Sequence, residues 1–257
     1  MLRVRPDGVV EGPDQVAVEE PLTIRVGGTT VATTMRTPGH DIDLALGWLV
    51  AEGAVRRADD LVEAIACDAD TVDVRLAPGV AAPTARIGAT TSACGLCGSD
   101  SIAEVLARRG PAPTPGEPLV LAAVLGSLPE ALRTAQRAFD RSGGLHAAGL
   151  FGSDGSTRCV REDVGRHNAV DKVVGWALRE GWLPLREHVL QVSGRASFEL
   201  TQKAAMAGIP VLAAVSAPST LAVDLARECG LTLVGFVRDG SFNVYAGAER
   251  LVLEPAV

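Results

Sequence analysis

Branched apolar and polar residues alternate in the first part of the chain, whereas longer apolar runs dominate the second part. The alternation over residues 15–37, interrupted by two adjacent glycines, predicts two strands joined by a hairpin. Apolar residues at helical spacing predict helices over residues 38–53 and 99–110, and residues 70–78 again alternate as a strand does. We therefore expect a strand-rich first part with two helices.

Near-continuous apolar strands alternate with helical periods in the second part of the chain. Helices are predicted over residues 121–139, 168–181, 196–208 and 219–229. Strands are predicted over residues 146–152, 188–194, 209–216, 231–238 and 242–247. This order predicts an α/β layered sandwich with helices on both faces of its sheet, a class of fold in which ligands bind at the carboxyl ends of the strands.

A proline-rich stretch marks the predicted domain boundary. Residues 111–118 read PAPTPGEP, with four prolines and no periodicity, which is typical of a linker. The boundary separates a smaller strand-rich α+β domain, residues 1–115, from an α/β domain, residues 116–257. A chain of 257 residues is long enough for two domains of this size.

The composition is that of a folded protein, with 47% hydrophobic and 21% charged residues. A net charge of −7 argues against extended nucleic-acid binding, because most of the surface would repel a polyanion. The first ten residues lack the apolar core of a signal peptide, so we expect a cytoplasmic protein with reduced thiols. Residues 204–223 are uncharged but contain glycine and two prolines, so they predict a helix end, a strand and a turn rather than a membrane span.

One cysteine motif stands out among the five cysteines. Residues 91–99 read TSACGLCGS, so that Cys94 and Cys97 are two residues apart and each is followed by glycine. A structural zinc site usually needs two such pairs, and here only Cys159 and His167 could complete one. The spacing therefore argues against zinc and leaves thiol chemistry.

Two kinds of thiol chemistry remain open. A helix predicted just after Gly98 would favour the thiolate that disulfide exchange needs, whereas Asp100 would oppose it. The flanking glycines make a flexible loop, which suits a thiol that must reach more than one partner. The sequence alone does not choose between exchange and carriage.

The residues around His146 resemble the histidine element of zinc nucleoside deaminases. Such sites need a glutamate two residues after the histidine, and Ala148 occupies that position. No Pro-Cys-x-x-Cys motif follows it. The pattern indicates a deaminase-like fold without deaminase chemistry, and His146 is interpreted as a packing or hydrogen-bonding residue.

Several predicted turns at the carboxyl ends of strands combine glycine, arginine and serine. Residues 161–172 are highly charged and place His167 at a helix start, where they would form either surface ion pairs or an anion site. Ser193 and Gly194 end a strand and Arg195 opens the next helix, a combination that suits a phosphate. Together these turns predict a site for a large phosphorylated ligand.

A further turn, GFVRDGSFNVY, lies near the end of the chain. Phe236 offers a stacking face, Arg238 a cation and Gly240 a backbone free to bend. Any one such turn could be an ordinary connection, but several at one sheet edge favour ligand binding.

The motifs MRTPGHD, SACGLCG, HAAGLF, REDVGRHNAVDKVVG, SGRASFELTQKAAMAGIPVLAAVSAPSTLAVDLA and LTLVGFVRDGSFNVY resemble, in this order, the FdhD family of formate dehydrogenase accessory sulfurtransferases. The resemblance covers about residues 20–247. It implies a persulfide sulfur carrier that accepts sulfur from a cysteine desulfurase. The acceptor would be the molybdenum or tungsten bis(molybdopterin guanine dinucleotide) cofactor, before its insertion into formate dehydrogenase.

The resemblance also assigns residues. Cys94 would carry the persulfide with Cys97 as its partner, in a homodimer with a cytidine-deaminase-like C-terminal domain. The cofactor-binding stretch of the family would match Phe236, Val237, Arg238, Asp239, Gly240 and Ser241. Together with the turns above, the cofactor site would include Ser193, Gly194, Arg195 and His167.

Two alternatives remain beside sulfur transfer. The protein could be a chaperone that only binds and delivers the cofactor, with the cysteines secondary. The deaminase-like pattern leaves a zinc enzyme acting on nucleotides as a third hypothesis.

Overall fold

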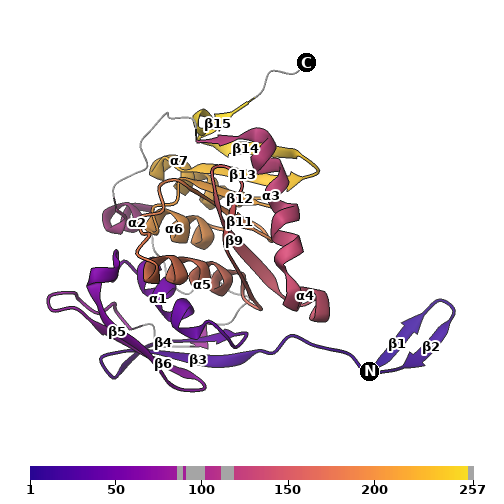
Figure 1. Ribbon diagram of the computed structural model, residues 1–257, viewed down its shortest axis with the longest axis horizontal. Coiled ribbons are helices and arrows are strands. Elements are labelled where there is room, and N and C mark those ends of the chain that lie inside the picture. Colours follow the sequence, from indigo (N-terminus) through magenta and orange to yellow (C-terminus); the bar gives the residue numbers. More distant parts are fainter. Residues whose placement is uncertain (86–88, 91–101, 111–118, 254–257) are drawn as a thin grey trace.

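A six-stranded mixed sheet forms the centre of the computed structural model, which describes residues 1–85, 89–90, 102–110 and 119–253 (Figure 1). The strand order is β10-β9-β11-β12-β13-β14. Strands β11, β12 and β13 are parallel, and β9 and β14 run antiparallel to their neighbours. The strands are β9 (His146–Gly152), β10 (Thr157–Asp163), β11 (His188–Val192), β12 (Val211–Ala214), β13 (Thr232–Arg238) and β14 (Ser241–Ala246).

Helices cover both faces of this sheet, as predicted (Figure 1). One face packs against α5 (Arg166–Arg179), α6 (Phe198–Met206) and α7 (Thr220–Cys229), and the other against α3 (Ala122–Ala135) with α4 (Arg137–Ser142) beside it. Because successive strand residues point to opposite faces, Leu190 lies in the cluster under α5 and Val189 in the cluster under α3. The mixed α/β class is confirmed, and its cytidine-deaminase-like character stays a prediction.

A second sheet of five strands lies beside the first and has the order β5-β6-β3-β4-β7. The predicted hairpin is present, because β3 and β4 are antiparallel and both turn glycines have positive φ, 56° at Gly27 and 82° at Gly28. The strands are β3 (Glu20–Val26), β4 (Thr29–Arg36), β5 (Leu61–Asp68), β6 (Thr71–Leu76) and β7 (Ala89–Thr90).

Helix α1 (Asp41–Ala51) lies between the second sheet and α5, and residues 43–51 are all buried. The backbones of α1 and α5 approach closely at two glycines. A Cβ on Gly47 would overlap the carbonyl oxygen of Asp171, and one on Gly175 would overlap that of Asp43. One hydrophobic cluster therefore runs from Leu22 to Leu233 and joins both parts of the chain, while the predicted boundary after residue 115 stays a prediction.

Some elements differ from the sequence prediction. The predicted helix 121–139 is split at Gln136, whose backbone (φ −80°, ψ 67°) is not helical. Strands β5 and β10 are not evident from the sequence, because β5 carries two and β10 four charged residues and both lie at sheet edges. The remaining elements are the projecting hairpin of β1 (Leu2–Arg5) and β2 (Gly8–Glu11), helix α2 (Ile102–Arg108), the paired strands β8 (Val120–Leu121) and β15 (Leu251–Val252), and two 3-10 turns, η1 (Ala58–Asp60) and η2 (Ala248–Arg250).

The long uncharged stretch folds as the sequence predicts. Residues 204–223 contain the end of α6, all of β12 and the start of α7. Within the described ranges, no helix combines the length and the apolar character that crossing a membrane requires.

The helix crossing can be tested with one methyl group. We expect Gly47→Ala to lower the free energy of unfolding by about 2 kcal/mol or more, because the added Cβ forces α1 and α5 apart. This loss of stability has the opposite sign to the effect of helix propensity, since alanine is more favourable than glycine in a helix by about 1 kcal/mol. Urea unfolding followed by circular dichroism measures it. Gly12→Ala is the control, because a Cβ there meets no atom within 4 Å, and equal stability of both variants would contradict the prediction.

Candidate functional site

The predicted thiol pair lies outside the described residues, so the roles of Cys94 and Cys97 stay predictions. The phosphate-type turns are described, and they meet at one edge of the six-stranded sheet. Strands β10 to β13 end there, and β9 and β14 begin there. The expectation that these turns come together is met for the turns after β11, β12 and β13.

The turns after β11 and β12 support each other through backbone hydrogen bonds. The N–H of Ser216 donates to the carbonyl of Gly194 (3.2 Å), and that of Ser219 to the carbonyl of Ala196 (3.0 Å). The hydroxyls of Ser197 and Ser219 cap α6 and α7 by accepting backbone N–H bonds. Two helix N-termini, each with a partial positive charge, therefore lie side by side at this edge.

The three predicted residues after β11 differ in their surroundings. The Ser193 Oγ accepts a hydrogen bond from the N–H of Ala147 (2.9 Å), and a Cβ on Gly194 would stand 3.5 Å from His146 Nδ1. Arg195 is exposed to solvent. Ser193 and Gly194 thus lie on the side of the sheet edge where His146 is, whereas Arg195 lies at the surface.

His167 is buried in the first turn of α5 and lies against α6. Its Nε2 stands 3.4 Å from Ser197 Oγ and 3.5 Å from Glu199 Oε2. Burial lowers the pKa of His167 to about 3, with a smaller effect of the Lys203 ammonium. The imidazole is therefore neutral at pH 7 and cannot attract a phosphate by charge.

Most of the charged stretch 161–172 is used inside the protein. The buried Lys172 Nζ pairs with Asp163 Oδ2 (2.7 Å) and donates to the carbonyl of Thr37 (2.8 Å). Asn168 donates to the same Asp163 side chain and to the carbonyl of Met35 (2.7 Å). These contacts fasten the β10–α5 turn to the chain that follows β4, so the ion-pair interpretation holds for these residues.

The hairpin between β13 and β14 presents the predicted cofactor stretch. Asp239 and Gly240 both have positive φ (50° and 74°), which is the geometry of an Asp-Gly hairpin turn. Phe236 also has positive φ (55°) at a bulge and is 37% exposed. Arg238 is exposed, whereas Val237 is fully buried in the cluster under α3, so its side chain cannot contact a ligand.

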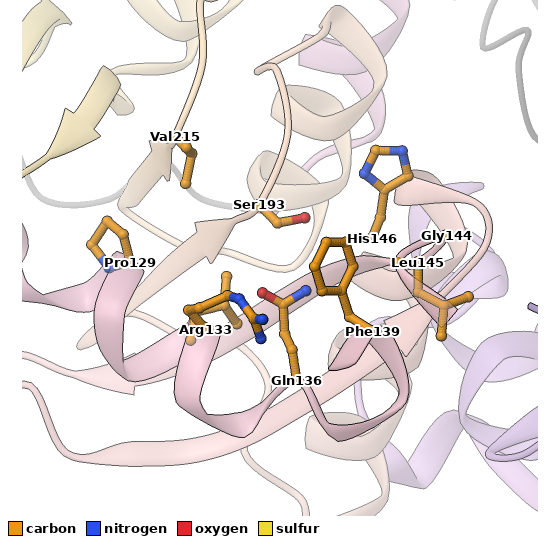
Figure 2. Close-up of a pocket in the computed structure, with 11 residues that line it drawn as sticks. Pro129, Arg133, Gln136, Phe139, Gly144, Leu145, His146, Ser193 and Val215 are labelled. Carbon is orange, nitrogen blue, oxygen red and sulfur yellow. The ribbon is translucent and has the colours of Figure 1, made fainter. Parts of the chain in front are cut away.

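A cavity of about 620 Å³ opens between α3, α4 and the sheet edge (Figure 2). Ser193 and Val215, which directly follow β11 and β12, form one wall. The opposite wall comes from Leu132, Arg133, Gln136 and Phe139, and His146 closes one end. The α3–α4 residues could not be predicted as part of a site, because they belong to no sequence motif and only the break at Gln136 sets them apart.

The surroundings of His146 in this cavity favour its neutral imidazole. Burial lowers the pKa of His146, and the Arg166 guanidinium lowers it further. Across the described ranges, no three His, Cys, Asp or Glu side chains come together in a way that could hold a metal. His146 is a neutral cavity-lining residue.

The state of His167 can be tested through pH. An unfolded histidine has a pKa near 6.5, and that of His167 is about 3, so between these values the unfolded state binds the extra proton. The contribution of His167 to the free energy of unfolding is therefore fully present above pH 6.5. Below that pH it falls by about 1.4 kcal/mol per pH unit. We expect the unfolding free energy of the wild type to fall by about 2 kcal/mol relative to that of His167→Gln from pH 7 to pH 5. An imidazole NMR titration of His167 with a midpoint near 6.5 would contradict this.

Comparison with known proteins places the chain in a defined group. A family model described as the FdhD/NarQ family matches residues 17–252. The crystal structure of a putative formate dehydrogenase accessory protein from Desulfotalea psychrophila superimposes with a TM-score of 0.79 and is 25% identical in sequence. The match covers 98% of this chain and 97% of that one.

Curated relatives agree over almost the whole length. A protein from Nocardia farcinica named Sulfur carrier protein FdhD is 54% identical over 98% of this chain and 93% of its own. A relative of the same name from Streptomyces avermitilis is 55% identical over 100% of this chain and 95% of its own. The Mycobacterium tuberculosis relative, again of that name, is 54% identical over 95% and 94%.

Proposed function

The chain belongs to the FdhD/NarQ family, and from this premise we propose that it is a sulfur carrier that acts in the maturation of formate dehydrogenase. The observation that carries the proposal is identity above one half, over nearly the full length, to proteins named sulfur carriers. The Cys-x-x-Cys motif supplies the thiols that such a role requires.

Loading is a transfer of sulfane sulfur between thiols. The Cys94 thiolate attacks the outer sulfur of a persulfide on a cysteine desulfurase. The bond between the two desulfurase sulfurs breaks, and the desulfurase cysteine leaves as a thiolate. Cys94 now carries the persulfide, and no electrons are gained or lost overall.

Delivery of the sulfur can follow two courses. In one, the Cys97 thiolate attacks the inner sulfur of the persulfide, a disulfide with Cys94 forms, and the outer sulfur leaves as hydrosulfide. The two thiols supply the two electrons that reduce the outer sulfur to hydrosulfide. A dithiol reductant must then reduce the disulfide. In the other course Cys97 only assists. The outer sulfur would pass directly to the acceptor, which would supply the two electrons that reduce it to sulfide, and Cys94 would be left as a thiolate.

We place the acceptor, the molybdenum or tungsten bis(molybdopterin guanine dinucleotide) cofactor, at the sheet edge as a bound substrate. Arg195 and Arg238 are exposed there, and the capped N-termini of α6 and α7 add partial positive charge. The exposed ring of Phe236 can stack on a flat heterocycle. A cysteine desulfurase as donor, formate dehydrogenase as client, a homodimer and a cytoplasmic site of action complete the proposal.

Mass spectrometry tests the carrier role. After incubation with a desulfurase and cysteine, we expect one added sulfur on the peptide that contains Cys94. Cys94→Ala should abolish it, because no thiolate remains to accept the sulfur. Cys67→Ala is the matched control, since Cys67 is an exposed free cysteine outside the motif and its loss should change nothing.

The same variants separate the carrier from a chaperone. A variant with both motif cysteines replaced by alanine should fail to support formate dehydrogenase activity in cells that lack the native gene. Full activity with that variant would refute sulfur transfer and favour cofactor delivery alone.

The cofactor site is tested independently. We expect Arg195→Ala and Arg238→Ala each to lower formate dehydrogenase activity in such cells about tenfold, since a charged hydrogen bond contributes about 1.5–3 kcal/mol. Persulfide loading should remain normal. Arg186→Ala is the control, because Arg186 is exposed just before β11, at the opposite edge of the sheet. Unchanged activity in both site variants would remove these residues from the site.

A further inference from the structure

The hairpin of β1 and β2 projects from the body of the protein and has no part in the chemistry above (Figure 1). We propose that it is an arm whose strand β1 adds to the edge of the five-stranded sheet, at β5, in a second copy of the chain. Two arms and two β5 edges then form a closed dimer with two-fold symmetry. The inference rests on the proposed function only in its homodimer, for which it names the surfaces.

The arm exposes apolar side chains to water. All residues of β1 and β2 are exposed, and four apolar side chains among them have exposed fractions between 59% and 76%: Leu2, Val4, Val9 and Val10. A two-stranded hairpin is marginally stable at best in water, and a third strand or a packed face is needed for stability. A surface that supplies a third strand therefore stabilises the arm.

The outer edge of β1 has backbone groups free to pair with another strand. The N–H of Gly12 donates to the carbonyl of Met1 (3.0 Å), so these two residues form a hydrogen-bonded pair at the base of the hairpin. Bonded and non-bonded pairs alternate along an antiparallel ladder, which puts Leu2 and Val4 in non-bonded positions. Their N–H and C=O groups therefore point away from β2, as a strand template requires.

The two faces of β1 differ in chemistry. Because successive side chains of a strand point to opposite faces, Leu2 and Val4 share one face, and Arg3 and Arg5 share the other. The strand contains no acidic residue. The arm therefore offers an edge strand that is apolar on one face and basic on the other.

Strand β5 presents a matching edge. It ends the strand order of its sheet, and six of its eight residues are exposed. Register shifts on both sides leave Glu63 to Ala66 as its regular stretch, which has the same length as β1. Ala64 and Ala66 lie on the inner face of the sheet, because the β6 residues opposite them are buried, whereas Glu63 lies on the outer face.

The two strands are complementary in charge. When the apolar face of β1 continues the inner face of the sheet, Arg3 and Arg5 lie on the outer face with Glu63. Strand β1 has two arginines and no acid, and β5 has two acids, Glu63 and Asp68, and no base. Opposite charges on neighbouring strands are favourable, whereas two β1 strands paired with each other would bring arginines together. The charges therefore favour β5 over a second arm.

The linker directs the arm away from the β5 of its own chain. Thr37, which follows β4, donates from its Oγ1 to the carbonyl of Val18 (2.9 Å) and so holds the end of the linker on the β4 side of β3. Strand β5 lies on the other side of β3, beyond β6, and Figure 1 shows it and the hairpin at opposite sides of the view. Linker residues 12–17 span about 20 Å when extended, which lets the arm reach a neighbouring molecule.

Cysteine cross-linking tests the contact, because β5 carries the exposed Cys67. The test uses Val4→Cys in a chain with Cys94→Ala and Cys97→Ala. A mild thiol oxidant should then produce a disulfide-linked dimer on a non-reducing gel, and the further change Cys67→Ala should abolish it. The control replaces Val4→Cys by Arg186→Cys, an exposed position just before β11, and should give no such dimer.

Three results of this test would overturn the inference. A dimer that persists without Cys67 would show that the arms meet each other, and a disulfide within one chain would show that the arm folds back. The absence of any new disulfide would remove β5 as the surface on which the arm docks.

Light scattering after size-exclusion chromatography measures the consequence for assembly. We expect the wild type to have twice the mass of one chain at micromolar concentration, and a variant without residues 1–11 to have a dimer dissociation constant at least about tenfold higher. Among the described residues, neither hydrophobic cluster includes a member of this segment, so the deletion should leave the thermal unfolding of the body unchanged. A monomeric wild type or equal dissociation constants would contradict the proposal.

Persulfide loading of the deletion variant reports separately on the proposed function. We expect normal loading, since the motif cysteines are retained. Loading without arm-dependent association refutes only the arm, and arm-dependent association without loading refutes only the carrier.

Discussion

The close crossing of α1 and α5 is the constraint on which the rest of the structure depends. Gly47 and Gly175 let the two backbones touch, and nearly all of α5 is buried between α1 and the six-stranded sheet. Any larger side chain at the crossing would separate the two sheets and open the shared core. The strand-rich part of the chain and the α/β part are therefore held in one orientation by the direct backbone contact of α1 with α5.

Buried charges fix the direction of that contact, which apolar packing alone leaves less well defined. Asp163 and Lys172 join the turn before α5 to the chain after β4, and Asp43 of α1 pairs with Arg161 and Arg179. Breaking such a pair leaves an uncompensated charge, which is far more destabilising than the pair is stabilising. The conspicuous charged motif of the sequence is explained by this alignment, which places the N-terminus of α5 at the sheet edge.

The sequence predicts the parallel strands well and the site only in part. Strands β11 to β13 are buried on both faces, so they are continuous apolar runs. Strand β10 escapes prediction because it is an edge strand whose charged side chains find partners in other elements. The turns after β11 and β13 could be predicted from glycine and arginine. The position of Gln136 in the cavity wall could not be predicted, because it depends on how the break between α3 and α4 is placed opposite the sheet edge.

A sulfur carrier and a nucleotide site place opposite demands on the chain. A persulfide must meet a donor protein and an acceptor in turn, for which the glycines beside both motif cysteines give conformational freedom. A cofactor must be held in one orientation while it is modified, which requires side chains fixed by packing. Ser193 illustrates this second demand, since the N–H of Ala147 donates to its Oγ (2.9 Å) and so orients the hydroxyl. In the proposed function, the sheet edge and the cysteine motif would divide these tasks between different segments of one chain, so that each could satisfy its own demand.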